Sequence, residues 1–280
     1  MLFYFEPATI KQKHNLLMLQ TPPVVLTISG HDPSGGAGIQ ADIEAISHHG
    51  CHACSVITAL TMQNTIGVKK ILPQPAAFVA EQINVLFEDF EPSAIKIGVI
   101  GSSEIAYALH KLILNHPEIP IIVDPVLASE TGDTLSDDNI VTGLIELLIP
   151  LATLITPNSL EARVLAPHAA ELEDCGQQLV SSGCANVLIT GTHENQNDVV
   201  NTLYNKSGIV KSQIWQRLDA SYHGSGCTLA SSIAAMIALG HDPVSAALEA
   251  QRYTWQSLTS GYKPGKGQFI PRRSLNVNSP

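Results

Sequence analysis

One short glycine-rich stretch, His223-Gly-Ser-Gly-Cys227, has residue types and spacing suited to chemistry, and it opens a long apolar segment. If that segment is a helix, the backbone N–H groups of Gly224–Cys227 point toward one place and can bind an anion. A helix N-terminus also favours the charged form of a thiol, so we expect a lowered pKa for Cys227. A base beside an anion hole suits phosphoryl transfer. The structural alternative is a glycine-rich cap with a buried cysteine, and we favour the functional interpretation.

A second glycine-rich stretch runs from Gly30 to Asp42, after a strand-like run and before a helical pattern. Its glycines match neither the dinucleotide-binding fingerprint nor the Walker A loop. In a doubly wound sheet such a turn lies where ligands bind, and glycines let the backbone approach them. A tight turn explains the stretch equally well. Asp42, one turn into the helix, can cap it or contact a ligand.

Two polar stretches also follow predicted strands. Gln63, in Thr61-Met-Gln-Asn-Thr65, can read the edge of a heterocycle, although an ordinary turn is the better explanation of that stretch taken alone. In the second stretch, Asn158 or Ser159 can cap a helix, with Glu161 near the capping-box position. The same Asn158 and Glu161 offer the sparse oxygen ligands that Mg²⁺ accepts beside phosphates.

The elements that position these residues alternate along the chain. We expect strands at Val24–Ser29, Ser55–Leu60, Gly67–Leu72, Ala94–Gly98, Pro120–Asp124, Thr153–Thr156, Asn186–Thr190, Val199–Tyr204 and Ile209–Arg217. We expect helices at Gly38–His49, Ala76–Phe87, Glu104–Asn115, Asp137–Leu148, Cys227–Leu239 and Pro243–Ser260, with two more between Thr156 and Asn186. Apolar strands between helices predict a mostly parallel sheet covered on both faces. We expect one α/β domain over 23–273, an N-terminal extension over 1–22 and a tail over 274–280.

Composition narrows the function classes. The 280 residues are 45% hydrophobic and 14% charged, with a formal net charge of −10 and only 15 Lys and Arg, which argues against nucleic-acid binding. We find no signal peptide and no membrane span. Five cysteines in a chain of this size favour a reducing cytoplasm. Cys51 and Cys54 fall in an apolar run, and we expect buried thiols there.

Together the motifs resemble a known family. They are Ile28–Asp42, Val56–Thr65, Lys96–Gly98, Asp124–Val126, Thr156–Asn158 with Glu161, and His223–Leu229, in order over Val24–Gln268. This set is similar to that of the hydroxymethylpyrimidine/phosphomethylpyrimidine kinases of thiamine synthesis. The resemblance implies a ribokinase-like three-layer α/β/α fold with a central, mostly parallel sheet of about eight strands.

The resemblance also implies roles for individual residues. Gln63 would read the pyrimidine, and the pocket around it would be lined by Gly30, Ala37, Asp42, Val99 and Val126. The anion hole would be Gly224, Ser225, Gly226 and Cys227, with Cys227 as the base that replaces the aspartate of sugar kinases. The Mg²⁺ and phosphate residues would be Asp124, Asn158 and Glu161, and the nucleotide would meet Thr190 and Thr192. ATP, Mg²⁺, a small pyrimidine substrate and a homodimer follow from the same resemblance.

The chain departs from the family pattern at several positions. His31 stands where Ser or Thr is usual, Val99 replaces Met, and Glu130 and Thr190 stand where Lys is usual. The stretch Gly261–Phe269 replaces a His-rich ending. Losing two cations near the phosphates bears on nucleotide affinity and on the second phosphorylation, and we interpret the pattern as that of a subgroup.

Three alternatives stay open at this point. A pyridoxal or pyridoxine kinase of the same superfamily also phosphorylates a ring with a hydroxymethyl arm. A hydrolase could use Cys227 as nucleophile with His223 as base. A vitamin-precursor binding protein without catalysis is the third, and the intact Gly-Ser-Gly-Cys stretch argues against it.

Overall fold

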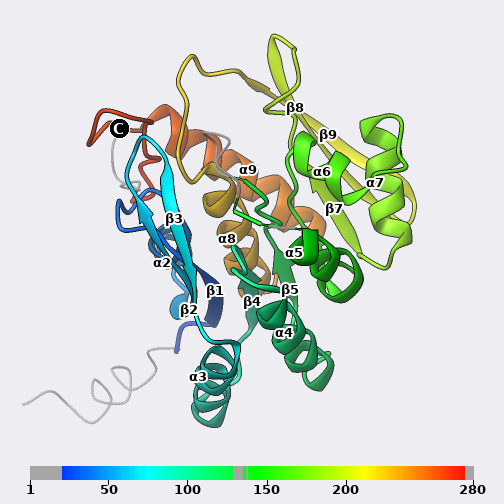
Figure 1. Cartoon of the computed structure of the whole chain (residues 1–280). Coiled ribbons are helices and arrows are strands. Elements are labelled where there is room, and N and C mark those ends of the chain that lie inside the picture. The colour runs from blue at the N-terminus through cyan, green and yellow to red at the C-terminus, as the bar shows by residue number, and fades with distance from the viewer. Residues whose placement is uncertain (1–20, 129–134, 137, 275–280) are drawn as a thin grey trace, which may run out of the picture.

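The computed structural model describes residues 21–128, 135–136 and 138–274. Glu130, nearly all of the predicted extension over 1–22 and nearly all of the tail over 274–280 lie outside these residues. Figure 1 shows helices on both sides of a central sheet.

Within the described residues, nine strands form one sheet in the order β3-β2-β1-β4-β5-β6-β7-β8-β9. Their bounds are β1 Val24–His31, β2 His52–Gln63, β3 Val68–Pro73, β4 Ala94–Ile97, β5 Ile121–Val123, β6 Leu154–Ile155, β7 Asn186–Ile189, β8 Asp198–Asn205 and β9 Gly208–Gln216. The six strands from β2 to β7 in this order pair in parallel. At one edge β3 pairs antiparallel with β2, and at the other edge β8 pairs antiparallel with both β7 and β9. The expectation of a mostly parallel sheet is confirmed.

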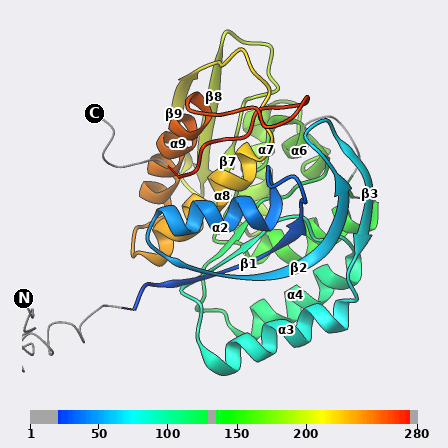
Figure 2. The ribbon, with the colours of Figure 1, turned by 90° about the vertical axis from the view of Figure 1, so that its left-hand side faces the viewer.

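The helices form two layers because successive strand side chains face opposite sides of the sheet. Val25, Ile122 and Leu188 pack with the layer of α2 (Gly38–His48), α8 (Ser225–Ala238) and α9 (Pro243–Thr259). Leu26, Ile97 and Val123 pack in a second core on the other face. The helices there are α3 (Ala76–Asp89), α4 (Ser103–Asn115), α5 (Asp138–Gly143), α6 (Ser159–Leu165) and α7 (Leu172–Ser181). Figure 2 shows α2 and α8 on one side of β1 and β2, with α3 and α4 on the other. The three-layer fold predicted from the sequence is confirmed.

Several boundaries differ from the predicted ones by a few residues, and three of these differences change how an element is described. β2 continues to Gln63 because its last residues pair with β3, so Gln63 lies on a strand end and not in a turn. The helix predicted over Asp137–Leu148 is divided into α5, a π-helical turn η1 (Leu144–Leu148) and a 3₁₀ turn η2 (Ile149–Leu151). α8 begins at Ser225, two residues early, because Gly224 is its N-cap. In the part of the chain that the structure describes, no helix combines the length and apolar character needed to cross a bilayer.

Candidate active site

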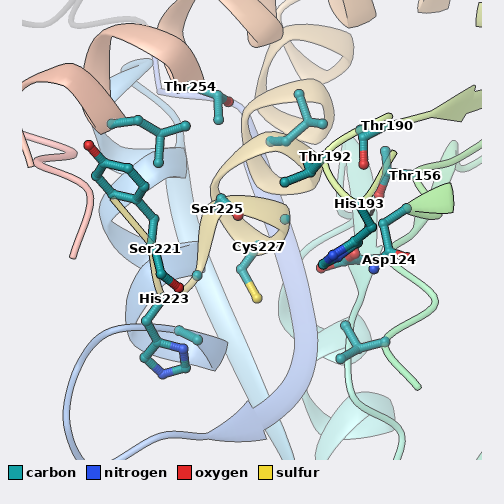
Figure 3. Close-up of a pocket in the computed structure, with 18 of the residues that line it drawn as sticks. Asp124, Thr156, Thr190, Thr192, His193, Ser221, His223, Ser225, Cys227 and Thr254 are labelled. Carbon is teal, nitrogen blue, oxygen red and sulfur yellow. Dashed lines mark hydrogen bonds between the residues drawn. The ribbon is translucent and has the colours of Figure 1, made fainter. Parts of the chain in front are cut away.

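A cavity of about 600 Å³ opens at the carboxyl ends of the parallel strands. Gly30, Gln63, Val99, Asp124 and Thr156 line it from the ends of five strands or from the residues just beyond them. The cavity gathers the predicted site residues Gly30, Ala37, Gln63, Val99, Asp124, Val126, Asn158, Glu161, Thr190, Thr192, Gly224, Ser225, Gly226 and Cys227. Figure 3 shows Cys227 in the middle of this lining, between His223 and Asp124. Residues from both ends of the sequence thus meet at one edge of the sheet.

The N-terminus of α8 forms one wall. Gly224 has a φ of 84°, in the left-handed region that suits glycine, and its carbonyl accepts hydrogen bonds from the N–H and hydroxyl of Thr228. A Cβ placed on Gly226 would lie 3.5 Å from Asp124 Oδ1. The small residues therefore bring the first amides of α8 close to the Asp124 carboxylate, and these amides can hold an anion.

Cys227 is buried, with 8% of its surface exposed. Burial raises the pKa of its thiol to about 12, while the nearby Lys96 cation acts in the opposite direction. The expected lowering of this pKa is therefore wrong for this structure. The reason is physical: burial removes the thiolate from water, and its effect on the pKa is larger than that of the Lys96 cation.

A fully buried ion pair lies behind this wall. Lys96 Nζ lies 2.9 Å from Asp42 Oδ1, and neither side chain has exposed surface. Asp42 also accepts hydrogen bonds from the hydroxyls of Thr27 and Ser231. Although burial alone would lower the pKa of Lys96, Asp42 raises it and keeps the side chain charged. Asp42 is fully buried and does not line the cavity, so the structure places it behind this wall and apart from the other predicted site residues.

A polar chain connects the first glycine-rich loop to the predicted pyrimidine-reading residue. Asp32 accepts hydrogen bonds from the N–H groups of Ser34, Gly36 and Ala37. His223 Nε2 lies 2.8 Å from Asp32 Oδ2 and 2.8 Å from Gln63 Nε2. When His223 Nε2 carries a proton, it can donate to Asp32; when it carries none, it can accept from Gln63. The two hydrogen bonds therefore need different protonation states of this nitrogen.

The contact with His223 favours the ionised form of Asp32. Although burial raises the pKa of Asp32, the hydrogen bonds from His223 and Ser34 outweigh it and lower the pKa to about 2. Asp32 was not among the predicted site residues, and its place in Gly-His-Asp-Pro-Ser-Gly-Gly, where Asx turns form, was the available signal. The contacts of His223 Nε2 to Asp32 and Gln63 also leave the hydrolase alternative without its Cys–His hydrogen bond among the described residues.

The predicted magnesium residues lie on another wall. Asn158 Oδ1 accepts from the N–H groups of Leu160 and Glu161, and Glu161 accepts from Asn158 N–H, so the predicted capping box is present. Asp124 is buried, and its Oδ2 has no hydrogen-bond partner among the described residues. Burial raises the pKa of Asp124 to about 6, against the opposing effect of Lys96. No cluster of three His, Cys, Asp or Glu side chains suited to a metal occurs in the described ranges.

The far wall carries the predicted nucleotide residues Thr190 and Thr192. The Arg217 guanidinium donates to the carbonyl oxygens of Thr192, Glu194 and Gln196, which orders the loop after β7. Arg217 is the one Lys or Arg among the described residues that line the cavity. It stands near the loop from which the usual lysine at position 190 is missing.

The sequence matches the phosphomethylpyrimidine kinase family model over residues 32–272. The chain belongs to this family. It is 32% identical to the hydroxymethylpyrimidine/phosphomethylpyrimidine kinase of Staphylococcus aureus MRSA252 over 88% of this chain and 92% of that one. It is 35% identical to the bifunctional thiamine biosynthesis protein of Geobacter sulfurreducens, over 94% of this chain but 55% of that longer protein.

Solved structures agree with the fold. The phosphomethylpyrimidine kinase of Clostridium difficile is 34% identical, with a TM-score of 0.73 over 84% of this chain and 99% of that one. The pyridoxal kinase of Staphylococcus aureus in complex with ADP is 25% identical, with a TM-score of 0.82 over 92% of this chain and 96% of that one. The family predicted from the sequence motifs is therefore confirmed.

Proposed function

We propose that this enzyme transfers the γ-phosphate of ATP to the hydroxyl of 4-amino-5-hydroxymethyl-2-methylpyrimidine, and then to the resulting monophosphate, in thiamine biosynthesis. The observation that carries the proposal is one cavity that combines Gln63, the amides of Gly224–Cys227 and Cys227 in a chain of this family. The relatives named above carry this kinase activity in their names, and a structural neighbour binds ADP.

In the proposed reaction, a bond forms between the substrate oxygen and the γ-phosphorus, and the bond to the β–γ bridging oxygen breaks. The amides at the start of α8 hold the transferred group, and Gln63 orients the ring. Cys227 takes the hydroxyl proton. Since burial raises the pKa of this thiol to about 12, it must first release its own proton to solvent, and Lys96 is the buried cation that favours this release.

One observation supports a magnesium site here. The buried, unpartnered Oδ2 of Asp124 is an oxygen ligand beside the proposed phosphate position, with Asn158 and Glu161 on the same wall. We propose that these residues hold Mg²⁺ directly or through water, and that Mg²⁺ neutralises phosphate charge when bound. Thr190, Thr192 and Arg217 would face the nucleotide.

Two finer proposals accompany the activity. The five cysteines are all free thiols, which fits a reducing cytoplasm. A homodimer is proposed from the family resemblance and is tested by sedimentation.

Pyridoxal kinase is the second candidate, because pyridoxal kinases give the higher structural similarity, with TM-scores of up to 0.82. Coupled ADP release should be measured with the pyrimidine alcohol, its monophosphate and pyridoxal, each with and without Mg²⁺. We expect the highest kcat/KM for the pyrimidine alcohol, clear turnover of its monophosphate, and activity that is lost without Mg²⁺. A higher kcat/KM for pyridoxal would reverse the assignment, and no turnover of any alcohol would favour a binding protein.

A further inference from the structure

A single buried arginine joins the two glycine loops of the site. Arg273 Nη2 donates to the carbonyl oxygen of Gly36, in the first loop, and to that of Gly224, the N-cap of α8. Its Nε donates to the Thr228 hydroxyl, and its Nη1 lies 3.2 Å from Glu44 Oε2. The side chain has no exposed surface. It lies outside the cavity lining, so it acts on the site only through the loops.

The two loops would not hold this arrangement unaided. A Cβ on Gly224 would lie 2.0 Å from the Gly36 carbonyl oxygen, so the backbones are in contact. The carbonyl oxygens of Gly36 and Gly224 are both directed at the same guanidinium nitrogen. Two acceptors that approach each other repel unless a donor lies between them. The Gly224 carbonyl also accepts from Thr228, so the buried Gly36 carbonyl is the one that depends most on the Arg273 donor.

The chemistry of arginine suits this position. A guanidinium presents five N–H donors in a rigid plane and stays charged when buried. Here it meets two carbonyls, a hydroxyl and a carboxylate at once, from the first loop, α8 and α2. A lysine keeps the charge but cannot meet four separated acceptors.

The main chain of Arg273 is itself fixed. The Tyr253 hydroxyl of α9 donates to the Arg273 carbonyl, and Arg272 N–H donates to Ser257. Figure 2 shows this C-terminal segment crossing near α8 and α9. Arg273 follows directly after the region that the family model matches, 32–272.

We propose that Arg273 is a positioning residue that sets the spacing between the substrate loop at Gly36–Ala37 and the anion hole at Gly224–Cys227. This inference rests on the proposed function for its kinetic consequence, but not for its structural one. Ala37 lines the substrate side and the α8 amides face the phosphate. Their spacing therefore determines how far the hydroxyl lies from the γ-phosphorus.

The test compares Arg273→Lys and Arg273→Met with the matched neighbours Arg272→Lys and Arg272→Met. The Arg272 side chain is exposed, donates to the Ser260 carbonyl oxygen and lies over the Tyr262 ring, 5.1 Å from its centroid. Because misplacement of reacting groups by about 1 Å can cost about 10²-fold, we expect both Arg273 variants to lose about 10²-fold in kcat, with smaller changes in KM. Hydrogen exchange on the unliganded variants should accelerate at residues 34–37 and 224–228 while the central strands keep wild-type protection. The Arg272 variants should match wild type.

Each outcome decides the inference. Wild-type kcat and wild-type loop protection in Arg273→Lys would overturn it. Acceleration of exchange across the whole sheet, with kcat lost only in proportion to unfolded protein, would also overturn it by showing a general stabilising role. If wild type phosphorylates no tested alcohol, the proposed function fails, and hydrogen exchange at the two loops still decides the inference.

Discussion

The thiol of Cys227 is subject to opposite influences from its surroundings. The Lys96 cation and a hydrogen bond with the backbone of Gly38 favour the thiolate, whereas burial and the carboxylates of Asp124 and Asp42 favour the thiol. Burial is the largest of these effects, so the thiol keeps its proton at neutral pH. Proton transfer to sulfur then becomes the pH-sensitive part of the proposed reaction.

Substitution of Cys227 should separate its role as a base from binding. Cys227→Ala should lower kcat by about 10²- to 10⁴-fold, the usual contribution of a general base, while ATP binding persists on the backbone amides. Cys227→Asp should recover part of the loss. Steady-state kinetics and calorimetric ATP titration measure the two effects.

The pH profile gives the control. With a thiol pKa near 12, the thiolate fraction of wild type increases with pH, so kcat should rise from about pH 6 to about pH 9. In Cys227→Asp the rise should lie at lower pH, because the ordinary pKa of a carboxyl is several units below that of a thiol. A phosphocysteine trapped at position 227 would contradict the role of base.

Among single residues, those within a short motif could be predicted from the sequence. Contacts between residues from distant segments could not. Gly224–Cys227 and Gln63 are readable because each lies in its own motif. The burial of Cys227 depends on neighbours from β4 and α2, and the pairing of Asp42 with Lys96 spans 54 positions. A lysine inside an apolar strand was the one local sign of that pair.

The N-cap of helix α8, at the end that lines the cavity, is Gly224, a position with no room for a side chain. Gly224 has a positive φ, and a Cβ there would meet both Gly36 and Arg273. Gly240, just beyond the other end of α8, also has a positive φ, 92°, but an added Cβ meets nothing within 4 Å among the described residues. A side chain at Gly240 would therefore cause backbone strain alone, whereas a side chain at Gly224 would cause both backbone strain and a steric clash.

Alanine at the two positions should give different losses of stability. Gly240→Ala should cost about 1–2 kcal/mol in the free energy of unfolding, from the left-handed backbone alone. Gly224→Ala should cost at least about 2 kcal/mol more, because one loop must also move. Urea unfolding measures both, and equal losses would contradict the contact between the loops.

The elements were predicted well wherever one periodicity decided them. The central strands and α8 are mostly apolar and bounded by glycine or polar residues. The extension of β2 to Gln63 depends on pairing with β3, and the π-helical turn at Leu144–Leu148 depends on packing. Neither leaves a pattern in its own segment.

Across the whole molecule, the contact of Asp32 with His223 joins residues 191 positions apart. The folded state holds the pKa of Asp32 at about 2, below its ordinary value of 3.8. A carboxyl with a depressed native pKa contributes stability above its unfolded pKa and loses it as pH falls. The contribution is therefore complete above about pH 5 and fades toward pH 2.

Asp32→Asn should lower the free energy of unfolding at neutral pH, and the difference from wild type should shrink as pH falls from about 5 to about 3. Urea unfolding at a series of pH values measures this difference. Asp198→Asn is a suitable control, since Asp198 is exposed at the start of β8 and its side chain makes no hydrogen bond or ion pair among the described residues. A constant difference for Asp32→Asn at every pH would contradict the assigned contact.

The position of Arg273 in the chain has a consequence for how the protein is made. It contacts Gly36 across 237 positions and Gly224 across 49, so the ribosome adds it long after both loops have been synthesised. At about 5–20 residues per second, the 49 residues that follow Gly224 up to Arg273 alone take roughly 2–10 seconds. During that interval the growing chain can already pair its central strands, but the two loops have no arginine between them. Premature release before codon 273 would therefore yield a polypeptide with most of its sheet and without an aligned site.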